Sequence, residues 1–196
     1  MQKVIPHDSI LVPDVATKVF EGEIFDVYHW PQTLFDDTSH TFEMLKRTDT
    51  VTVMCVVDDK ILVINDEQPH LGMRKTFPGG RVDPEDASIE MAAKREVLEE
   101  TGYSFKNWRL ILVQQPYKKI EWFVYMLLAW DEESKTEPKL DAGERISVES
   151  LTIDELKKVV NGRFVNLGDS MAIIESLESL EQLLALPEFD GQTVDR

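Results

Sequence analysis

Residues 78–103 read PGGRVDPEDASIEMAAKREVLEETGY, and within this stretch a glycine turn gives way to helical spacing. The apolar residues that can share one inward-facing stripe are Ile89, Ala92, Ala93 and Val97. Ser88 stands where an N-cap is needed, and Gly102 stands where a left-handed residue commonly ends a helix. The pattern predicts a helix over residues 88–101 with both ends marked.

Three carboxylates share one surface of this expected helix. Glu96, Glu99 and Glu100 stand at i, i+3 and i+4, and Arg95 precedes Glu99 by one turn. Such a surface can be merely solvated, with Arg95 as an ordinary surface partner, or it can be a set of ligands. The glycine turn at 78–80 favours ligands, because a bare backbone carbonyl beside carboxylates makes the oxygen cage that Mg²⁺ prefers.

The stretch resembles the signature of the Nudix hydrolase family, G-x5-E-x7-R-E-U-x-E-E-x-G-U, where U is a bulky aliphatic residue. Residues 95–103 match its second half, except that aromatic Tyr103 takes the last U position. The first half carries one extra residue, so that Asp86 or Glu85 replaces the first Glu of the signature. The resemblance implies an enzyme that hydrolyses a pyrophosphate bond.

The resemblance also implies roles for individual residues. Glu96, Glu99, Glu100 and the carbonyl of Gly79 are expected to bind Mg²⁺, with Mn²⁺ as a possible substitute. Arg95 is expected to orient the carboxylates.

The chain has 196 residues and a formal net charge of −16. This acidity argues against nucleic acid and anionic membranes as partners, because both are polyanions that reward basic patches. A small phosphorylated ligand remains possible when divalent cations lie between the negative charges. The lone cysteine, Cys55, lies in an apolar run, and the first residues lack a signal-peptide pattern, so we expect a buried thiol and a cytoplasmic setting.

The rest of the chain alternates strand and helix patterns. Strands are predicted in the segments 18–30, 51–57, 60–64, 108–113, 120–130 and 146–148. The first of these indicates a hairpin around Gly22, and a polar segment, 31–40, interrupts the pattern before it resumes at Thr41. Asp58-Asp59 predicts a two-residue hairpin turn.

Two helical regions close the sequence. A capping box at Thr152 opens a helix that Gly162 can close, and a last helix is predicted from Asp169 to about Leu186, before Pro187. The element order indicates an α+β fold, a Nudix-type α/β/α sandwich with a mixed sheet and an N-terminal antiparallel β arm.

Beyond the signature, nearly the whole chain is similar to the ADP-ribose pyrophosphatase branch of the family. That similarity implies an N-terminal β arm over residues 1–46, a Nudix domain over 47–196, and a homodimer whose active site borrows residues across the interface. It also nominates Glu144 as the catalytic base; Glu144 can equally be a solvated loop residue, and Glu96 is the alternative base.

Further residues are candidates for the substrate side of the site. They are Tyr28, Trp30, Gln68, Arg74, Gly80 and Glu121. Tyr28 and Trp30 can stack on a nucleobase, although large aromatics more commonly serve core or dimer packing. The branch usually has Glu-Leu-Pro-Ala-Gly where residues 76–80 read TFPGG, and this departure puts ADP-ribose itself in question as the substrate.

The sequence therefore predicts a Mg²⁺-dependent hydrolase that cleaves the pyrophosphate link of a nucleoside diphosphate joined to a sugar or similar moiety, ADP-ribose or another nucleotide sugar. The product would be a nucleoside monophosphate. Two alternatives remain open: a nucleoside triphosphate pyrophosphatase of the same family, and a non-catalytic Nudix domain that senses a nucleotide.

Overall fold

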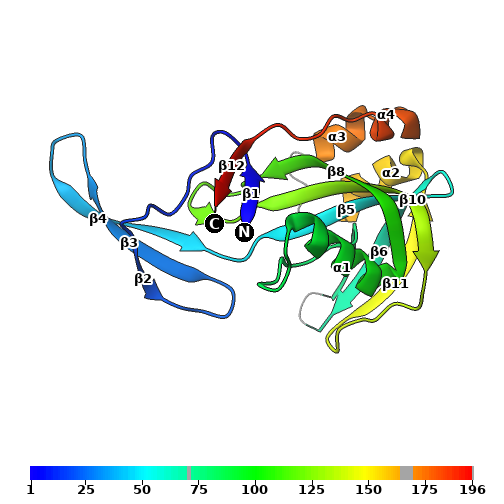
Figure 1. Cartoon of the computed structure of the whole chain (residues 1–196), viewed down its shortest axis with the longest axis horizontal. Helices are drawn as coiled ribbons and strands as arrows, with labels where there is room; N and C mark the ends of the chain where they lie inside the picture. Colours follow the sequence, from blue (N-terminus) through cyan, green and yellow to red (C-terminus); the bar gives the residue numbers. More distant parts are fainter. Residues whose placement is uncertain (70–71, 164–169, 196) are drawn as a thin grey trace.

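The computed structural model describes residues 1–69, 72–163 and 170–195 (Figure 1). Its main body is built on one mixed sheet. The strands, in their order across that sheet, are β11 (Arg145–Leu151), β6 (Lys60–Gln68), β5 (Thr50–Val57), β10 (Val124–Lys135) and β8 (Tyr103–Gln114), and β7 (Gly72–Thr76) pairs with β6. The β5–β10 pair is parallel and the other pairs are antiparallel.

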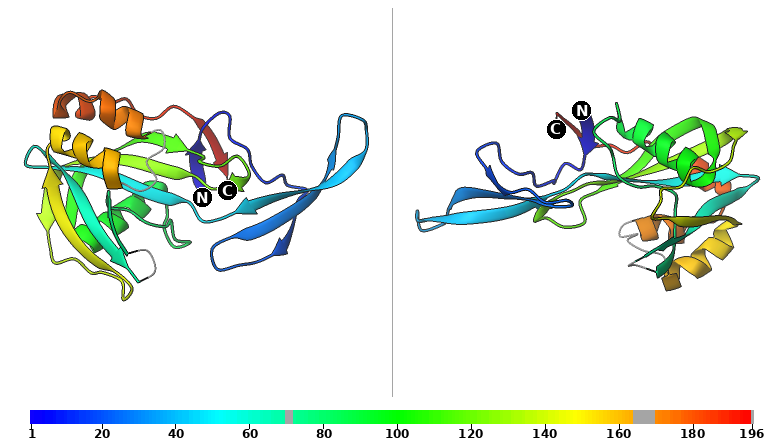
Figure 2. Two further views of the ribbon diagram at one scale, coloured as in Figure 1. Left: turned by 180° about the vertical axis from the view of Figure 1, so that it is seen from behind. Right: turned by 90° about the horizontal axis from the view of Figure 1, so that it is seen from below.

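Helices cover both faces of this sheet, as Figures 1 and 2 show. Helix α1 (Ile89–Thr101) packs on one face through Ala92, Ala93 and Val97. The other face is covered by α2 (Ile153–Arg163), α3 (Ser170–Ser176) and α4 (Leu180–Leu184). The predicted α/β/α sandwich with a mixed sheet is confirmed, and Cys55 is fully buried within it.

Local sequence signals set the main turns and caps. Asp58 and Asp59 both have positive φ, 48° and 58°, as a tight two-residue hairpin turn requires. The Ser88 side chain accepts a hydrogen bond from Met91 N at 3.2 Å and so caps α1. At the opposite end Gly102 has φ 74°, and a Cβ there would lie 2.0 Å from the carbonyl oxygen of Thr136. The C-terminal glycine is therefore required both by the backbone turn and by the chain that crosses it.

Four expectations about element boundaries were wrong. The strand expected over 120–130 is divided into β9 (Ile120–Glu121) and β10, which belong to different sheets. Strand β3 (Asp26–Thr33) runs through Pro31, so the polar interruption shrinks to the turn before β4 (Ser39–Lys46). Helix α2 continues through Gly162 to Arg163, because glycine weakens a helix without obligatorily ending it. The last helix is divided into α3 and α4, since Ser179 caps a new helix by accepting from Gln182 N at 3.3 Å. Asp169, its predicted first residue, lies outside the described residues.

The N-terminal segment divides between the body and a projecting sheet. Strand β1 (Gln2–Ile5) pairs with β12 (Gln192–Asp195), and Ile5 is fully buried in the body. Strands β2 (Thr17–Phe20), β3 and β4 form a second antiparallel sheet, which β9 (Ile120–Glu121) joins in parallel to β4. This β arm extends away from the body in every view (Figures 1 and 2).

No helix among the described residues combines the length and the apolar character needed to cross a membrane.

Candidate active site

The glycine turn after β7 packs edge-on against β5. Val51 N donates to the Gly80 carbonyl at 2.9 Å, and Val53 N donates to the Pro78 carbonyl at 2.8 Å. Gly79 has φ 149°, and a Cβ there would lie 2.1 Å from the Val51 carbonyl oxygen. A Cβ on Gly80 would lie 2.6 Å from Oε1 of Glu96. The two glycines thus let the turn approach both the sheet and a carboxylate of α1.

Helix α1 presents its carboxylates to this turn at different depths. Glu100 is only 7% exposed, and its Oε2 accepts a hydrogen bond from Gly79 N at 2.7 Å. Burial raises the pKa of Glu100 well above its ordinary value, against the opposing effect of that hydrogen bond. Burial also raises the pKa of Glu96 to about 7, although Arg95 favours its ionised form. Glu99 is more exposed and contacts Arg95 at 3.1 Å.

Arg95 links the helix to the loop before it. Its Nη1 donates to Glu96 Oε1 at 2.9 Å and to Glu99 Oε2 at 3.1 Å. Its Nη2 donates to the Arg81 carbonyl and to Asp86 Oδ2, both at 2.9 Å. The hydrogen bonds with Asp86 are the largest cause of the raised pKa of Arg95, and in return Arg95 lowers the pKa of Asp86. Arg95 therefore orients two carboxylates while a third anchors it.

The structure also shows which of Asp86 and Glu85 takes the place of the first Glu of the signature. Asp86 makes two hydrogen bonds to Arg95 and accepts a third from Asp83 N at 2.8 Å, whereas Glu85 is exposed. The extra residue in the loop therefore allows Asp86, whose side chain is shorter than that of a glutamate, to reach the guanidinium of Arg95.

Replacing Asp86 by Ala is expected to lower the free energy of unfolding by about 2 kcal/mol, since charged hydrogen bonds to Arg95 are lost. Glu85→Ala is the matched control and is expected to change it by less than about 0.5 kcal/mol, as for other exposed substitutions. Urea denaturation of the two variants measures both values. Equal losses in the two variants would contradict the assignment of Asp86 as the anchor of Arg95.

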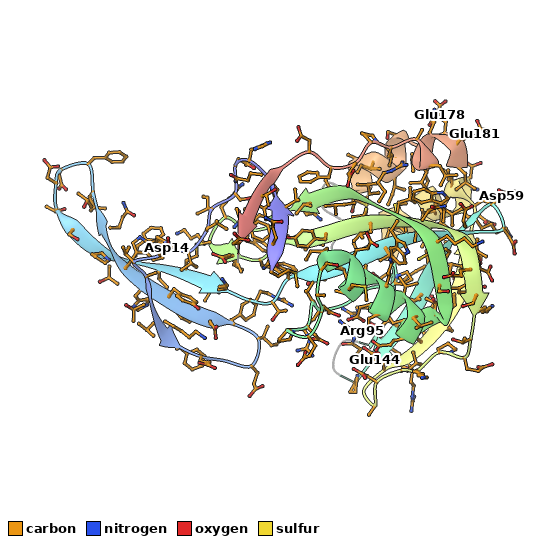
Figure 3. All side chains as sticks on the ribbon, in the orientation of Figure 1. Asp14, Asp59, Arg95, Glu144, Glu178 and Glu181 are labelled. Atoms are coloured by element: carbon orange, nitrogen blue, oxygen red, sulfur yellow. The ribbon has the colours of Figure 1, made fainter. Side chains whose placement is uncertain are left out.

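Glu144 reaches the same region from the loop before β11. Its loop is tied to α1, because Lys139 N donates to the Glu99 carbonyl at 2.8 Å. Burial raises the pKa of Glu144, and the charges of Asp141, Asp66 and Glu99 raise it further. In the view of Figure 3, Glu144 and Arg95 are labelled at the lower edge of the body, and Glu178 and Glu181 at its upper edge. The glutamate on the late loop therefore belongs to the same acidic cluster as the helix residues.

A cavity of about 390 Å³ opens beside Glu144. Its lining comes from the end of β6, the start of β7 and the loop before β11, and comprises Glu67, Gln68, Pro69, Gly72, Ala142, Gly143, Glu144 and Arg145. A polar hollow of this size is large enough for part of a nucleotide.

The oxygen donors of the site suit a hard divalent cation. Across residues 1–69, 72–163 and 170–195, no group of three or more His, Cys, Asp or Glu side chains is arranged to hold a metal ion. Arg95 occupies one oxygen of Glu96 and one of Glu99. Burial and mutual repulsion make Glu96 and Glu100 hard to ionise. A bound cation would stabilise the ionised form of both carboxylates.

Gln68 and Arg74 meet at a residue that the sequence analysis did not single out. Asp66 is 5% exposed, and its Oδ2 accepts from Arg74 Nη2 at 2.7 Å and from Gln68 Nε2 at 3.1 Å. The sequence gives no clear signal for it, because residues 61–64 are all apolar and alternation therefore does not distinguish the phase of Asp66 from that of its neighbours. A carboxylate at such an inward position points to a function or to a buried partner.

Three other candidates lie away from the acidic cluster. Glu121 is 3% exposed, with its oxygens engaged by Lys46 Nζ and Val12 N, both at 2.6 Å, so its carboxylate fixes the root of the β arm. Tyr28 and Trp30 lie on β3 in the arm, where Trp30 packs against Phe42 at 5.0 Å between ring centroids. Within one chain the arm projects away from α1, so these aromatics do not join the site (Figure 1).

Comparison with known families accounts for this combination of turn, helix and carboxylates. Residues 46–166 match the model of the NUDIX domain. The chain belongs to the Nudix family. It is a Nudix pyrophosphohydrolase, an enzyme that acts on phosphorus anhydride bonds, and the residues that build the site lie inside the matched region.

Among solved structures, this Nudix chain is similar to one described as an ADP compounds hydrolase. The two share 16% sequence identity over 93% of this chain and 96% of the other, with a TM-score of 0.68. At that identity the likeness concerns the fold, and it includes the segments outside the Nudix domain. A search of curated proteins finds no match.

Proposed function

We propose that this Nudix hydrolase cleaves the pyrophosphate bond of a nucleoside diphosphate joined to a sugar or similar moiety, with Mg²⁺ as its cofactor. The observation that carries the proposal is the packing of the glycine turn against the acidic face of α1, where Gly79 N donates to Glu100 at 2.7 Å and Gly80 lies against Glu96. The description of the structural neighbour as acting on ADP compounds supports this class of substrate.

The metal would be held by Glu96, Glu99, Glu100 and the carbonyl of Gly79, and Mn²⁺ is expected to substitute. When bound, the metal neutralises the diphosphate and makes water a better nucleophile. Nη1 of Arg95 holds one oxygen of Glu96 and one of Glu99, which would lower the cost of ordering these side chains around a cation.

Glu144 is the proposed general base. Its raised pKa lies closer to neutrality than that of an exposed glutamate, which makes its carboxylate a better proton acceptor. The attacking water forms a bond to phosphorus and gives its proton to Glu144, while the bond from that phosphorus to the bridging oxygen breaks. Glu96, with a pKa of about 7, is the alternative base.

A substrate panel tests the proposal. We expect hydrolysis of nucleoside diphosphate sugars with Mg²⁺ or Mn²⁺, release of a nucleoside monophosphate, and loss of activity in EDTA. Chromatography with mass detection identifies the products for these compounds, for dinucleoside polyphosphates, for NADH and for nucleoside triphosphates. Faster turnover of triphosphates would favour the triphosphate pyrophosphatase, and ligand binding without any turnover would favour a sensor.

The proposal extends to a homodimer formed through the β arm. The arm is a small sheet without a core of its own, and it exposes large apolar side chains, among them Val19, Phe20, Ile24 and Phe35. Exposed apolar side chains of this kind are typical of an interface with another protein chain. A second copy would cover them and would bring Tyr28 and Trp30 to the partner's cavity, where they could stack on a nucleobase.

Size-exclusion chromatography with light scattering is expected to give twice the 22.5 kDa mass of one chain. Phe20→Asp, which puts a charge on the exposed part of the arm, is expected to shift the protein toward monomer. A wild-type monomer at micromolar concentration would contradict the dimer.

A further inference from the structure

Successive side chains of β6 point to opposite faces of the sheet, so only every second one lies on the face that carries α1. Leu62 packs in the same core cluster as Ala93 and Val97 of α1, whereas Ile61 and Val63 pack in the cluster on the other face. Because side chains two and four residues further along a strand share a face, Asp66 lies on the α1 side of the sheet. Gln68 follows on that same face.

Asp66 is an unusual residue for such a position. Its side chain is 7% exposed, and Arg74 stands directly opposite on β7 in the strand register. The Oδ2 atom is shared between Arg74 and Gln68, but Oδ1 is buried and has no hydrogen-bond partner among the described residues. A buried ion pair with an unmet acceptor is generally less stable than well-packed apolar side chains, so stability alone does not explain it.

Asp66, Arg74 and Gln68 differ in how far solvent or a ligand can reach them. The Arg74 side chain is 26% exposed and can meet a ligand, and Gln68 lines the cavity of about 390 Å³ beside Glu144. Asp66 is too deeply buried to touch a substrate itself. One carboxylate oxygen fixes both a guanidinium and an amide, and each of these is a hydrogen-bond donor suited to phosphate oxygens.

We propose that Asp66 is a positioning residue that holds Arg74 and Gln68 toward the diphosphate of the bound substrate. The inference rests on the proposed function, because it presumes a diphosphate ligand that reaches from the cavity lined by Gln68 to the neighbouring Arg74. Since Arg74 and Gln68 would contact the diphosphate before and during the reaction, Asp66 supports substrate binding more than the chemical step.

A double-mutant cycle tests this role. The variants are Asp66→Asn, Arg74→Ala and the two combined, and the probe is ADP titrated calorimetrically in Ca²⁺, a hard cation that also takes oxygen ligands. We expect Asp66→Asn to weaken ADP binding about tenfold and Arg74→Ala by about tenfold to a hundredfold. The double variant is expected to lose less affinity than the sum of the two single losses, because Asp66 acts in part through Arg74 and otherwise through Gln68. Additive losses, or unchanged affinity in Asp66→Asn, would overturn the inference.

Steady-state kinetics supply a second readout. For Asp66→Asn we expect KM to rise about tenfold while kcat stays within about twofold, the pattern for an interaction made equally before and during the reaction. A fall in kcat at unchanged KM would overturn the inference. Glu149→Gln is the matched control: it breaks the ion pair that joins Lys75 of β7 to Glu149 of β11, and it is expected to leave both constants unchanged.

Two further comparisons keep the outcomes separate. Should Asp66→Asn fail to fold, Arg74→Lys keeps the charge but loses the planar fork, and it is expected to weaken ADP binding severalfold; unchanged binding would overturn the inference. Coupled ADP binding in a protein that hydrolyses nothing would support the inference and refute the proposed function. Hydrolysis of the substrate together with additive losses of ADP affinity at Asp66 and Arg74 would support the proposed function and refute the inference.

Discussion

Glu100→Gln is expected to lower kcat by about a thousandfold or more while the protein stays folded. Glu100 is buried and accepts a hydrogen bond from Gly79 N at 2.7 Å, and glutamine keeps both the shape and an acceptor oxygen there. What glutamine removes is the negative charge that would bind the cation next to the diphosphate. Losses of this size are typical when an enzyme loses electrostatic stabilisation of its transition state.

Thermal unfolding should separate this effect from misfolding. The melting temperature of Glu100→Gln is expected to equal or exceed that of the wild type without metal, because burial of the charged form is unfavourable. Glu90→Gln is the matched control: Glu90 lies exposed in the first turn of α1, paired with Lys94, and its replacement should leave kcat unchanged. Full activity in Glu100→Gln would remove Glu100 from the metal site.

The second large effect concerns pH and stability. In EDTA, the protein is expected to lose stability as pH rises from about 5 to about 8. The folded pKa of Glu96 is about 7, against an ordinary value of 4.5, so between these values the folded state holds a proton that the unfolded state has released. The unfolded state therefore gains relative stability as pH rises through this window, by up to about 3 kcal/mol for Glu96. The raised pKa of Glu100 acts in the same direction.

Mg²⁺ should reverse this loss, because cation and proton compete for the same carboxylates. At pH 8 we expect saturating Mg²⁺ to raise the melting temperature by several degrees, and at pH 5.5 to raise it much less. The overall charge of −16 also disfavours the folded state at high pH, so Glu96→Gln is the necessary comparison. In that variant the pH slope in EDTA should become shallower. An unchanged slope would show that Glu96 is not the titrating group.

The sequence predicted the parts of the fold that local chemistry decides. The caps of α1 at Ser88 and Gly102, the turn at Asp58-Asp59 and the capping box at Thr152 each depend on residues a few positions apart. Arg95, Glu96, Glu99 and Glu100 were placed together for the same reason, since one helix fixes their spacing.

The missed features depend on distant parts of the chain. Strands β1 and β12 are four residues each and pair across almost the whole sequence, so neither carries a pattern of its own. Glu121 gave no local sign that Lys46 and Val12 would enclose it. Asp66 follows a run that is apolar on both faces of the strand, so its pairing with Arg74 also depends on tertiary structure. The division of the last helix differs, because Ser179 carries a short polar side chain of the kind that caps a helix.

Hydrolysis of a nucleoside diphosphate sugar in ¹⁸O-labelled water tests the central claim most directly. The account predicts that wild-type protein with Mg²⁺ yields a nucleoside monophosphate and a phosphorylated sugar, with a single ¹⁸O atom in one of the two products. Glu100→Gln should yield neither product at a comparable rate. Release of orthophosphate or of inorganic pyrophosphate in their place, or equal yields from the wild type in EDTA, would contradict cleavage of the pyrophosphate link at this acidic site.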